Sequence, residues 1–477
     1  MSSIAQVATT NLKEAGLGDV LYVPGDQLYD ERERSYWSLT PRLEPWAIVQ
    51  PRSTEEVSKA LKALVKTDGC KFAIRSGGHM SWAGANNIEK GVTIDLGLMS
   101  KTTYNHETKL ASLQPGGRWT EVYADVEKHG VMVAGGREGL VGVGGLLIGG
   151  GLTFYTCRIG WACDQIVNYE IVLADGSVVE ANATSNPDIF RVLKGGHNNF
   201  GIVTKFDMRT FEAKDIWDGN IVHSKAVTKQ VVEAFVDFTE NLTENPDNHI
   251  LAMWAYMPQA KEHFINMVLT SLDGVENPKS LQKFLKIPGQ QNMKTKTVAE
   301  KVAEFLQPSG KYDYWLTVTF KLDSRIVQKA ADAFEHLIEE LRKTIPDNDF
   351  TLSMVLQPLL ASWTQHSTAQ GGNMLGLERL RGNCVIMVGT VQVDTLELSK
   401  VASPVFKAMF DEIKSYSMSL DKHVEFCYAN YCDGSQDPFR TYGEENLRKM
   451  KKVSAKHDPT GVFQNRVPGG FKISNVK

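Results

Sequence analysis

The sequence of 477 residues is too long for one compact hydrophobic core, so two substantial lobes are expected. Its 42% hydrophobic and 23% charged residues are ordinary for a globular protein. The formal net charge of −4 provides no broad basic surface, which argues against nucleic acid or an anionic membrane as a partner.

The N-terminal stretch contains no apolar signal core, and no run of about 18 apolar residues occurs anywhere. We therefore expect a cytoplasmic protein without a transmembrane segment. The six cysteines are scattered and form no CxxC pair, so free thiols are favoured over a disulfide framework or a zinc site.

From about residue 45 to 210, short β-branched runs alternate with helical stretches and glycine turns. The segment 53–69 predicts a helix, with Ser53 or Thr54 as its N-cap and Gly69 as its end. The pair Asp175-Gly176 predicts the turn of a hairpin. The other elements predicted here are a strand at 47–51, a strand running into a glycine turn at 71–79, a strand at 91–99, a helix at 119–130 and the hairpin itself at 168–181.

Between about 215 and 425 glycine becomes rarer, and longer amphipathic helices alternate with strands. This pattern predicts a second, α/β lobe that carries an antiparallel sheet, and the chain as a whole is expected to be α+β. The predicted elements are helices at 231–242 and 326–345, strands at 313–322 and 383–393, a polar loop at 273–297, and a basic, helical tail at 438–477 that ends in a loop.

The segment 135–151 reads GGREGLVGVGGLLIGGG and interleaves glycine with branched apolar residues. Such loops can approach another molecule closely, and their successive N–H groups suit a pyrophosphate. Gly142 and Gly144 begin a Rossmann-like G-x-G, but Leu147 stands where the third glycine belongs, and there is no GK[ST] motif. With further glycine turns at 75–79, 114–117 and 194–204, the sequence predicts several loops that close on one extended cofactor by a different geometry.

These motifs, in this order, resemble the berberine bridge enzyme-like flavoprotein oxidases of the vanillyl-alcohol oxidase or p-cresol methylhydroxylase (PCMH) superfamily. The matching segments are AIVQPRSTEEV, RSGGH, TIDLGLM, GVGGLLIGGG, DGSVVEA, LKGGHNNFGIVT, YANYCDG and KHDPTGVFQN. The resemblance implies a two-lobed, PCMH-type FAD-binding fold. Its FAD domain would span 1–212, with a core at about 41–212, its substrate domain 213–425, and a C-terminal segment at 426–477 would complete the FAD domain.

The resemblance also implies which residues hold FAD. Asp164 is expected to orient backbone near the cofactor, and His197 either touches the flavin or caps a turn. The cofactor-binding residues that it indicates are Arg75, Ser76, Gly77, Gly78, His79, Pro115, Gly116, Gly139, Val141, Gly142, Gly144, Gly145, Gly149, Asp164, Ile202 and Asn430.

His79 stands at the position that carries an 8α-histidyl bond to the flavin in this family, so FAD is expected to be covalently attached through His79. Many relatives add a second link from a cysteine, but the matching residue here is Glu138. A single link and no cysteinyl link are therefore expected. Val141 stands at the family's oxygen gate, where a small residue implies access for O2.

The YANY segment supplies the predicted catalytic residues, Tyr428 and Tyr431, as groups that handle a substrate proton. On a strand, period-two alternation would put Tyr428 and Asn430 on one face and Tyr431 on the other. The alternative is that both tyrosines are packed aromatic side chains.

At three positions where relatives carry polar or aromatic polar residues, this chain has Ser81, Leu152 and Val388. The resemblance therefore implies an apolar pocket that suits a hydrophobic or aromatic small molecule, such as a secondary-metabolite intermediate, better than a sugar. Gln357 and Asn373 are further candidates for the pocket.

The function implied is that of an FAD-dependent oxidase. It would transfer a hydride from an apolar or aromatic small molecule to flavin N5, and O2 would reoxidise the flavin to give H2O2. Two alternatives stay open: a flavin-containing, redox-neutral cyclase or isomerase of the same fold, and a flavin-binding protein without catalysis. The expected partners are the small-molecule substrate and O2, and no metal is expected. The sequence does not indicate whether the protein is a monomer or an oligomer.

Overall fold

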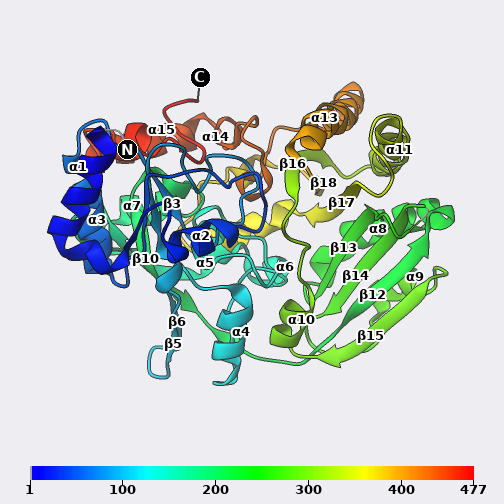
Figure 1. The fold of residues 1–477 in the computed structure, drawn as a ribbon. Helices are drawn as coiled ribbons and strands as arrows, with labels where there is room; N and C mark the ends of the chain where they lie inside the picture. Colours follow the sequence, from blue (N-terminus) through cyan, green and yellow to red (C-terminus); the bar gives the residue numbers. More distant parts are fainter. Residues whose placement is uncertain (1–2, 261, 477) are drawn as a thin grey trace.

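A computed structural model describes residues 3–260 and 262–476 of the chain. Figure 1 shows two lobes side by side, one built mainly from the N-terminal part of the chain and one that contains a broad sheet. The strands form sheets of four, five, two and eight members among the described residues. The predicted α+β class with an antiparallel sheet in the second lobe is confirmed.

The four-stranded sheet of the N-terminal lobe has the order β1-β2-β4-β3, and its strands β2, β4 and β3 are parallel. Helix α3 connects β2 to β3, two parallel strands that flank β4, because parallel strands need a crossover connection. Ser53 is its N-cap and accepts a hydrogen bond from the N–H of Glu56, which confirms one of the two predicted caps. The bounds are β1 Leu21–Tyr22, β2 Ala47–Val49, α3 Thr54–Lys66, β3 Phe72–Arg75 and β4 Val92–Asp95.

The five-stranded sheet is antiparallel, in the order β5-β6-β10-β8-β9. Strands β8 and β9 form the predicted hairpin, and a two-stranded ribbon of β7 and β11 leads toward the second lobe. The bounds are β5 Thr102–Asn105, β6 Leu110–Leu113, β7 Val131–Met132, β8 Ile166–Val172, β9 Val178–Asn182, β10 Ile202–Arg209 and β11 Phe211–Glu212.

Helices surround the two N-terminal sheets (Figure 1). Helix α1 packs against α3, and α5 forms inside the glycine-rich segment. The bounds are α1 Ser3–Leu12, α2 Gln27–Arg34, α4 Trp119–Glu127, α5 Val143–Ile148, α6 Thr156–Ile159 and α7 Pro187–Leu193.

The eight-stranded antiparallel sheet of the second lobe has the order β15-β12-β14-β13-β17-β18-β16-β19. Its long central strands alternate their side chains between a helix-covered face and a face directed toward the N-terminal lobe. The bounds are β12 Ile216–Ser224, β13 Asn248–Tyr256, β14 Phe264–Ser271, β15 Gln290–Lys296, β16 Tyr312–Lys321, β17 Phe350–Leu359, β18 Cys384–Val393 and β19 His423–Val424.

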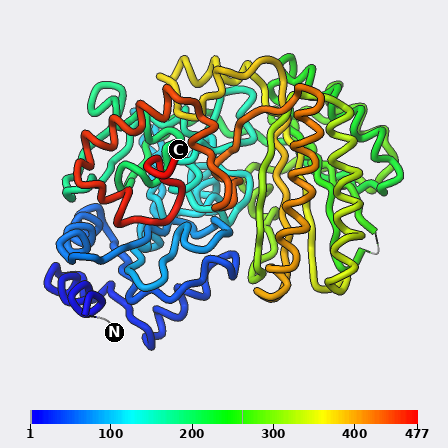
Figure 2. The backbone as a smooth tube through the Cα atoms, turned by 90° about the horizontal axis from the view of Figure 1, so that it is seen from above, coloured from blue at the N-terminus to red at the C-terminus, as the bar shows by residue number. Residues whose placement is uncertain are grey.

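Helices α8, α11 and α13 lie together on the outer face of this sheet (Figures 1 and 2). Helix α11 buries an apolar stripe that includes Ile326, Phe334 and Leu341, which is the spacing of one helix face. The bounds are α8 Thr228–Asn241, α9 Gln282–Leu285, α10 Val298–Glu304, α11 Ser324–Arg342, α12 Thr364–Ala369 and α13 Leu396–Ser419.

The C-terminal segment returns to the N-terminal lobe, where Figure 2 shows it beside the early part of the chain. It contains α14 (Pro438–Thr441) and α15 (Glu444–His457). The Arg466 guanidinium donates to the carbonyl of Cys70 at 2.6 Å, and the Asn199 amide donates to the carbonyl of Phe471 at 3.0 Å. The two ends of the chain therefore share one lobe.

Two expectations about local structure are wrong. The segment 273–297 is not only a loop, because Gln290–Lys296 forms the edge strand β15 paired with β12. Tyr428 and Tyr431 do not lie on a strand, because Ala429–Tyr431 forms one 3₁₀ turn, and the alternation argument for them does not apply. A polar edge strand and a single turn both lack a hydrophobic period in the sequence.

Asp313 generates a prediction about pH. It lies at the start of β16 with 3% of its surface exposed, and its Oδ1 accepts a hydrogen bond from Gln392 at 2.6 Å. Its Oδ2 is buried without a hydrogen-bond partner among the described residues. Burial raises the pKa of Asp313 from its ordinary 3.8 to about 7.

The folded state therefore binds a proton that the unfolded chain has lost, and the free energy of unfolding should fall as pH rises from about 4 to about 7. Between about pH 4 and pH 7, the free energy of unfolding should fall by roughly 2–4 kcal/mol less in Asp313→Asn than in the wild type. Urea unfolding of both proteins across this range measures the effect, with the exposed Asp332→Asn as control. Equal pH profiles for wild type and Asp313→Asn would contradict the assignment.

Candidate functional site

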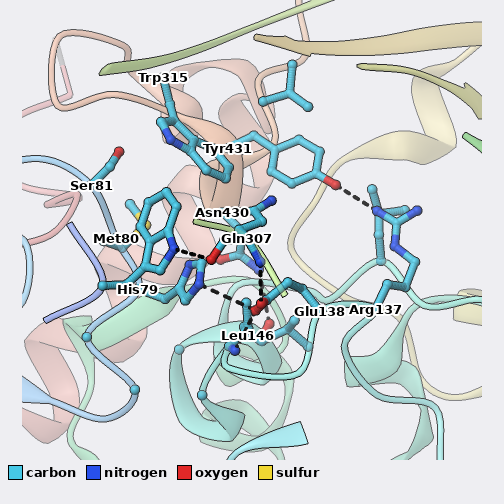
Figure 3. A pocket seen from close by; sticks show the side chains of 18 of the residues that line it. His79, Met80, Ser81, Arg137, Glu138, Leu146, Gln307, Trp315, Asn430 and Tyr431 are labelled. Carbon is cyan, nitrogen blue, oxygen red and sulfur yellow. Dashed lines mark hydrogen bonds and ion pairs between the residues drawn. The ribbon is translucent and has the colours of Figure 1, made fainter. Parts of the chain in front are cut away.

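A cavity of about 520 Å³ lies between the two lobes, within the usual range of cofactor and ligand sites of roughly 300–1,000 Å³. Its floor comes from the glycine turns of the N-terminal lobe and its roof from β13, β14, β16, β17 and β18. Residues of the 428–432 turn close one side. Figure 3 shows side chains from both lobes projecting into this space.

The floor depends on a backbone contact between two glycine turns. A Cβ atom on Gly77 would lie 2.5 Å from both Cα and N of Gly142, so only glycine fits there. The Ser76 hydroxyl donates to the carbonyl of Pro115 at 2.5 Å and accepts from the N–H of Gly144 at 3.2 Å. The turn after β3 is therefore locked onto the start of α5. A Cβ on Gly145, by contrast, meets no protein atom within 4 Å, and Gly145 lines the cavity.

His79 follows this contact directly and points into the cavity (Figure 3). Gly78 before it has φ of 65°, a conformation that favours glycine. The imidazole stacks on Trp37, with ring centroids 4.5 Å apart and an angle of 13° between the planes. Its Nε2 is buried, has no hydrogen-bond partner among the described residues, and lies 3.4 Å from Oε2 of Glu138. The ring is held in place by Trp37 and lies on the cavity wall beside the Glu138 carboxylate, which fits the expected bond to a flavin.

Glu138 holds its own loop together. Its Oε2 accepts hydrogen bonds from the N–H groups of Leu140 and Val141 at 3.0 and 2.9 Å, and its Oε1 accepts one from the N–H of Gln307 at 3.2 Å. The Gln307 carbonyl in turn accepts from the indole of Trp37 at 3.4 Å. This carboxylate therefore ties the second lobe to the loop beside His79, at the position where the resemblance implies a cysteine in other members.

Tyr431 reaches the cavity from the 3₁₀ turn and belongs to a polar cluster (Figure 3). Its hydroxyl accepts a hydrogen bond from the Arg137 guanidinium at 2.7 Å and lies 3.2–3.3 Å from the side-chain amide of Gln357. Arg137 also donates to Oε1 of Gln357 at 2.6 Å. A phenol with such defined partners can hold or move a proton in the cavity.

Tyr428 has a different environment. It is 1% exposed, and its hydroxyl accepts hydrogen bonds from the N–H groups of Gly151 and Leu152, each at 3.0 Å. The Asn430 amide donates to the same oxygen at 2.9 Å. Burial raises the pKa of Tyr428 well above its ordinary value. These contacts favour a role in fixing the glycine turn at 149–152, and they make Tyr431 the better candidate for proton handling.

The structure brings most of the predicted site residues into one cavity wall. His197 and Gln357 also line it, and burial lowers the pKa of His197 to about 4, so its imidazole is neutral. The predicted residues that line the cavity are Ser76, Gly77, Gly78, His79, Pro115, Val141, Gly142, Gly144, Gly145, Ile202, Tyr428, Asn430 and Tyr431.

Five predicted cofactor residues, Arg75, Gly116, Gly139, Gly149 and Asp164, do not line the cavity. The Arg75 guanidinium lies 3.4 Å from the Asp95 carboxylate and stacks over the ring of Tyr36. A Cβ on Gly116, Gly139 or Gly149 would strike protein atoms within 2.2 Å, so these glycines pack the loops.

Asp164 accepts hydrogen bonds from the N–H of Trp161 and from the side chains of Ser367 and Asn373, at 2.6–3.0 Å. It thus joins the lobes from behind the cavity floor. Asn373 is occupied in this contact and is not a cavity residue.

The roof is less apolar than expected. Val388 and Met253 line it as aliphatic side chains, but Thr390, Ser353 and Asn266 also face the cavity. Alternate residues of a strand lie on the same face of a sheet. The pairing of β13, β17 and β18 therefore identifies which of their side chains face the cavity.

Sequence reasoning missed Trp37, Arg137 and Trp315 as cavity residues. Arg137 had a detectable signal, because it is one of two charged residues in the glycine-rich segment 135–151. Trp37 had none, since its stacking on His79 is a contact between distant segments.

Neither a cluster of metal ligands nor a membrane-spanning helix occurs in residues 3–260 and 262–476. No group of three His, Cys, Asp or Glu side chains in this part of the chain is placed to hold a metal ion. Within the same residues, none of the helices combines the length and apolarity needed to span a bilayer.

The glycine contact generates the next prediction. Gly77→Ala must push the two turns apart, since the added Cβ would lie 2.5 Å from Gly142. We expect it to lower the unfolding free energy by about 1–3 kcal/mol and to reduce the bound FAD per chain severalfold. Gly18→Ala, where a Cβ meets nothing within 4 Å, is the matched control. Full FAD content in purified Gly77→Ala would show that the contact does not shape the site.

Known proteins with similar sequences indicate the family to which this chain belongs. Residues 45–182 match the model of an FAD binding domain. The FAD-dependent monooxygenase drtC of Aspergillus calidoustus is 34% identical over 481 residues, which cover 100% of this chain and 92% of that protein. The FAD-dependent monooxygenase sdcF of Emericella nidulans is 36% identical over 480 residues, which cover 100% of both chains.

Solved structures share the fold at lower identity. Glucooligosaccharide oxidase from Acremonium strictum superposes with a TM-score of 0.80 at 18% identity and covers 98% of this chain and 99% of its own. The oxidase of 6-hydroxy-D-nicotine from Arthrobacter nicotinovorans gives 0.77 at 18%, covering 94% and 97%. Physcomitrella patens BBE-like 1 gives 0.76 at 19%, covering 95% and 97%. The full-length fungal matches show that the chain belongs to the family of FAD-dependent oxidoreductases that includes these two proteins, and the solved structures show that it has the PCMH-type, berberine bridge enzyme-like fold.

Proposed function

We propose that this FAD-dependent oxidoreductase is an oxidase that acts on an apolar or aromatic small molecule, with O2 as the electron acceptor. The observation that carries the proposal is the pair of functional groups in one cavity: His79, whose ring is stacked on Trp37 on the floor, and Tyr431 with its hydrogen-bond partners on the side. The substrate C–H would lie between them, because the cavity is the space that both groups face.

The cofactor would be held by the glycine turns around Gly77 and Gly142 and joined to the chain through His79 alone. Two observations support this arrangement: the His79 ring is stacked on Trp37 and lines the cavity, and the residue beside it is a carboxylate, Glu138, rather than a cysteine. The chemistry that a bound flavin supplies is acceptance of a hydride from a substrate carbon, after which the electrons pass to oxygen. Val141, a small half-buried residue on the cavity wall, would leave room for O2.

Tyr431 would hydrogen-bond the substrate hydroxyl or amine and take up its proton while releasing its own hydroxyl proton to solvent. Arg137 and Gln357 fix the phenol oxygen by three contacts of 2.7–3.3 Å, so the group needs little reorganisation when substrate binds. Trp37, stacked on His79, and Trp315 on the roof provide flat apolar surfaces for an aromatic ring. The matching fungal proteins are named monooxygenases, so transfer of an oxygen atom to the product is the competing outcome.

The fate of oxygen tests the proposal. Holoprotein would be screened for flavin bleaching with aromatic alcohols and phenols, beginning with para-hydroxybenzyl alcohol, and the active compound would then be turned over under labelled O2. An oxidase should release one H2O2 per product and place no label in the product. Labelled product would identify a monooxygenase, and product without oxygen consumption a redox-neutral cyclase or isomerase. Either result would overturn the oxidase proposal.

Tyr431→Phe removes the hydroxyl and keeps the ring. We expect kcat/KM to fall by about 10²–10⁴-fold, while FAD content stays at the wild-type level. Tyr314→Phe, on β16 outside the cavity wall, is the matched control and should stay within about twofold. A rate for Tyr431→Phe close to that of the control would exclude Tyr431 from proton handling.

A further inference from the structure

Charge on the cavity wall is unevenly distributed. Among the described residues, Arg137 and Glu138 are the Lys, Arg, Asp or Glu side chains that line it. Glu138 accepts three backbone hydrogen bonds and lies toward His79. Arg137 forms no ion pair with any carboxylate in residues 3–260 and 262–476, although it is only partly exposed. A cation in such a place is costly unless an anion joins it.

The partners of Arg137 are all neutral. Its guanidinium lies 3.1 Å from Nε2 of His249 and donates to Gln357 at 2.6 Å and to Tyr431 at 2.7 Å. Burial, together with the charge of Arg137, lowers the pKa of His249 well below its ordinary value, so this imidazole is an uncharged acceptor. The nearby Lys301 is balanced by Asp218 and takes no part. The positive charge of Arg137 therefore stays uncompensated at the cavity surface.

The chain holds this cation rigidly. Arg137 follows Gly135 and Gly136, whose backbone packs so closely on Trp119 that a Cβ on either would meet the indole within 2.4 Å. Three hydrogen-bonding partners from β13, β17 and the 3₁₀ turn then fix the guanidinium. A planar guanidinium held in this way is suited to bind a carboxylate or another anionic oxygen.

We propose that Arg137 binds an anionic oxygen of the substrate, so that the substrate class is an acidic aromatic compound with a carboxylate or an ionised phenol. This rests on the proposed function, in which the same cavity receives the substrate. One acidic group on the substrate would pair with the Arg137 guanidinium, which has no carboxylate partner in residues 3–260 and 262–476. Because Arg137 also contacts Tyr431, the anion would anchor the substrate next to the group that handles its proton.

The test measures binding to the holoprotein from flavin difference spectra, and calorimetry gives the same comparison without a flavin signal. The probes are benzoate, para-nitrophenolate and the neutral, similarly shaped benzamide. Benzoate or para-nitrophenolate should bind at least tenfold more tightly than benzamide, and the tighter of the two identifies the source of the anionic oxygen. Equal affinities for all three probes would overturn the inference.

Two variants locate the preference at Arg137. Arg137→Met should abolish it, while Arg325→Met, an exposed arginine of α11, should leave it unchanged. Gln357→Glu keeps Arg137 but places a carboxylate at the position now 2.6 Å from its guanidinium, so it should also abolish the preference. This second variant keeps the inference testable if Arg137→Met does not fold. An anion preference that survives both changes would exclude Arg137 as its source.

Binding and turnover separate the two proposals. A clear anion preference without flavin reduction by any aromatic compound would overturn the oxidase function and leave Arg137 as an anion site. Oxidation of neutral aromatic compounds without any preference for anions would support the oxidase and overturn the role of Arg137.

Discussion

The close approach of Gly77 to Gly142 is the contact on which the rest of the site depends. At this point two backbones touch where a methyl group would lie 2.5 Å from its neighbour, so the turn after β3 and the start of α5 become one rigid floor. His79 leaves the floor on one side, and Glu138 and Arg137 come from the loop just before it on the other. This packing constraint fixes the backbone positions from which these side chains reach the cavity.

The electrostatics of the cavity follow from how each charged group is partnered. Glu138 is satisfied by backbone N–H groups of both lobes, which makes it a structural clamp beside His79 rather than a free acid. Arg137 has only neutral partners, and buried imidazoles such as His197 and His249 stay uncharged. One lobe thus presents a floor that suits an extended cofactor, and the interface between the lobes presents one cation that suits an acidic substrate.

Much of the fold could be predicted from local signals, and the site only in part. The helix after Ser53, the hairpin at Asp175-Gly176 and the glycine turns carry their own chemistry in the sequence, and they appear as expected. The edge strand 290–296 was missed because polar residues occupy both faces, and the 3₁₀ turn that carries Tyr431 has no period to detect. Contacts such as Trp37 on His79, or Asp164 with Ser367 of α12, join segments far apart in sequence, so only the folded chain reveals them.

The most direct test of this site is to find where the flavin is attached. Holoprotein would be denatured in acid, digested with trypsin and mapped by mass spectrometry. The geometry predicts that the flavin mass stays with the peptide that contains His79 and that the peptide containing Glu138 is unmodified. Release of all flavin into the acid supernatant, or flavin on any other peptide, would contradict the single attachment through His79.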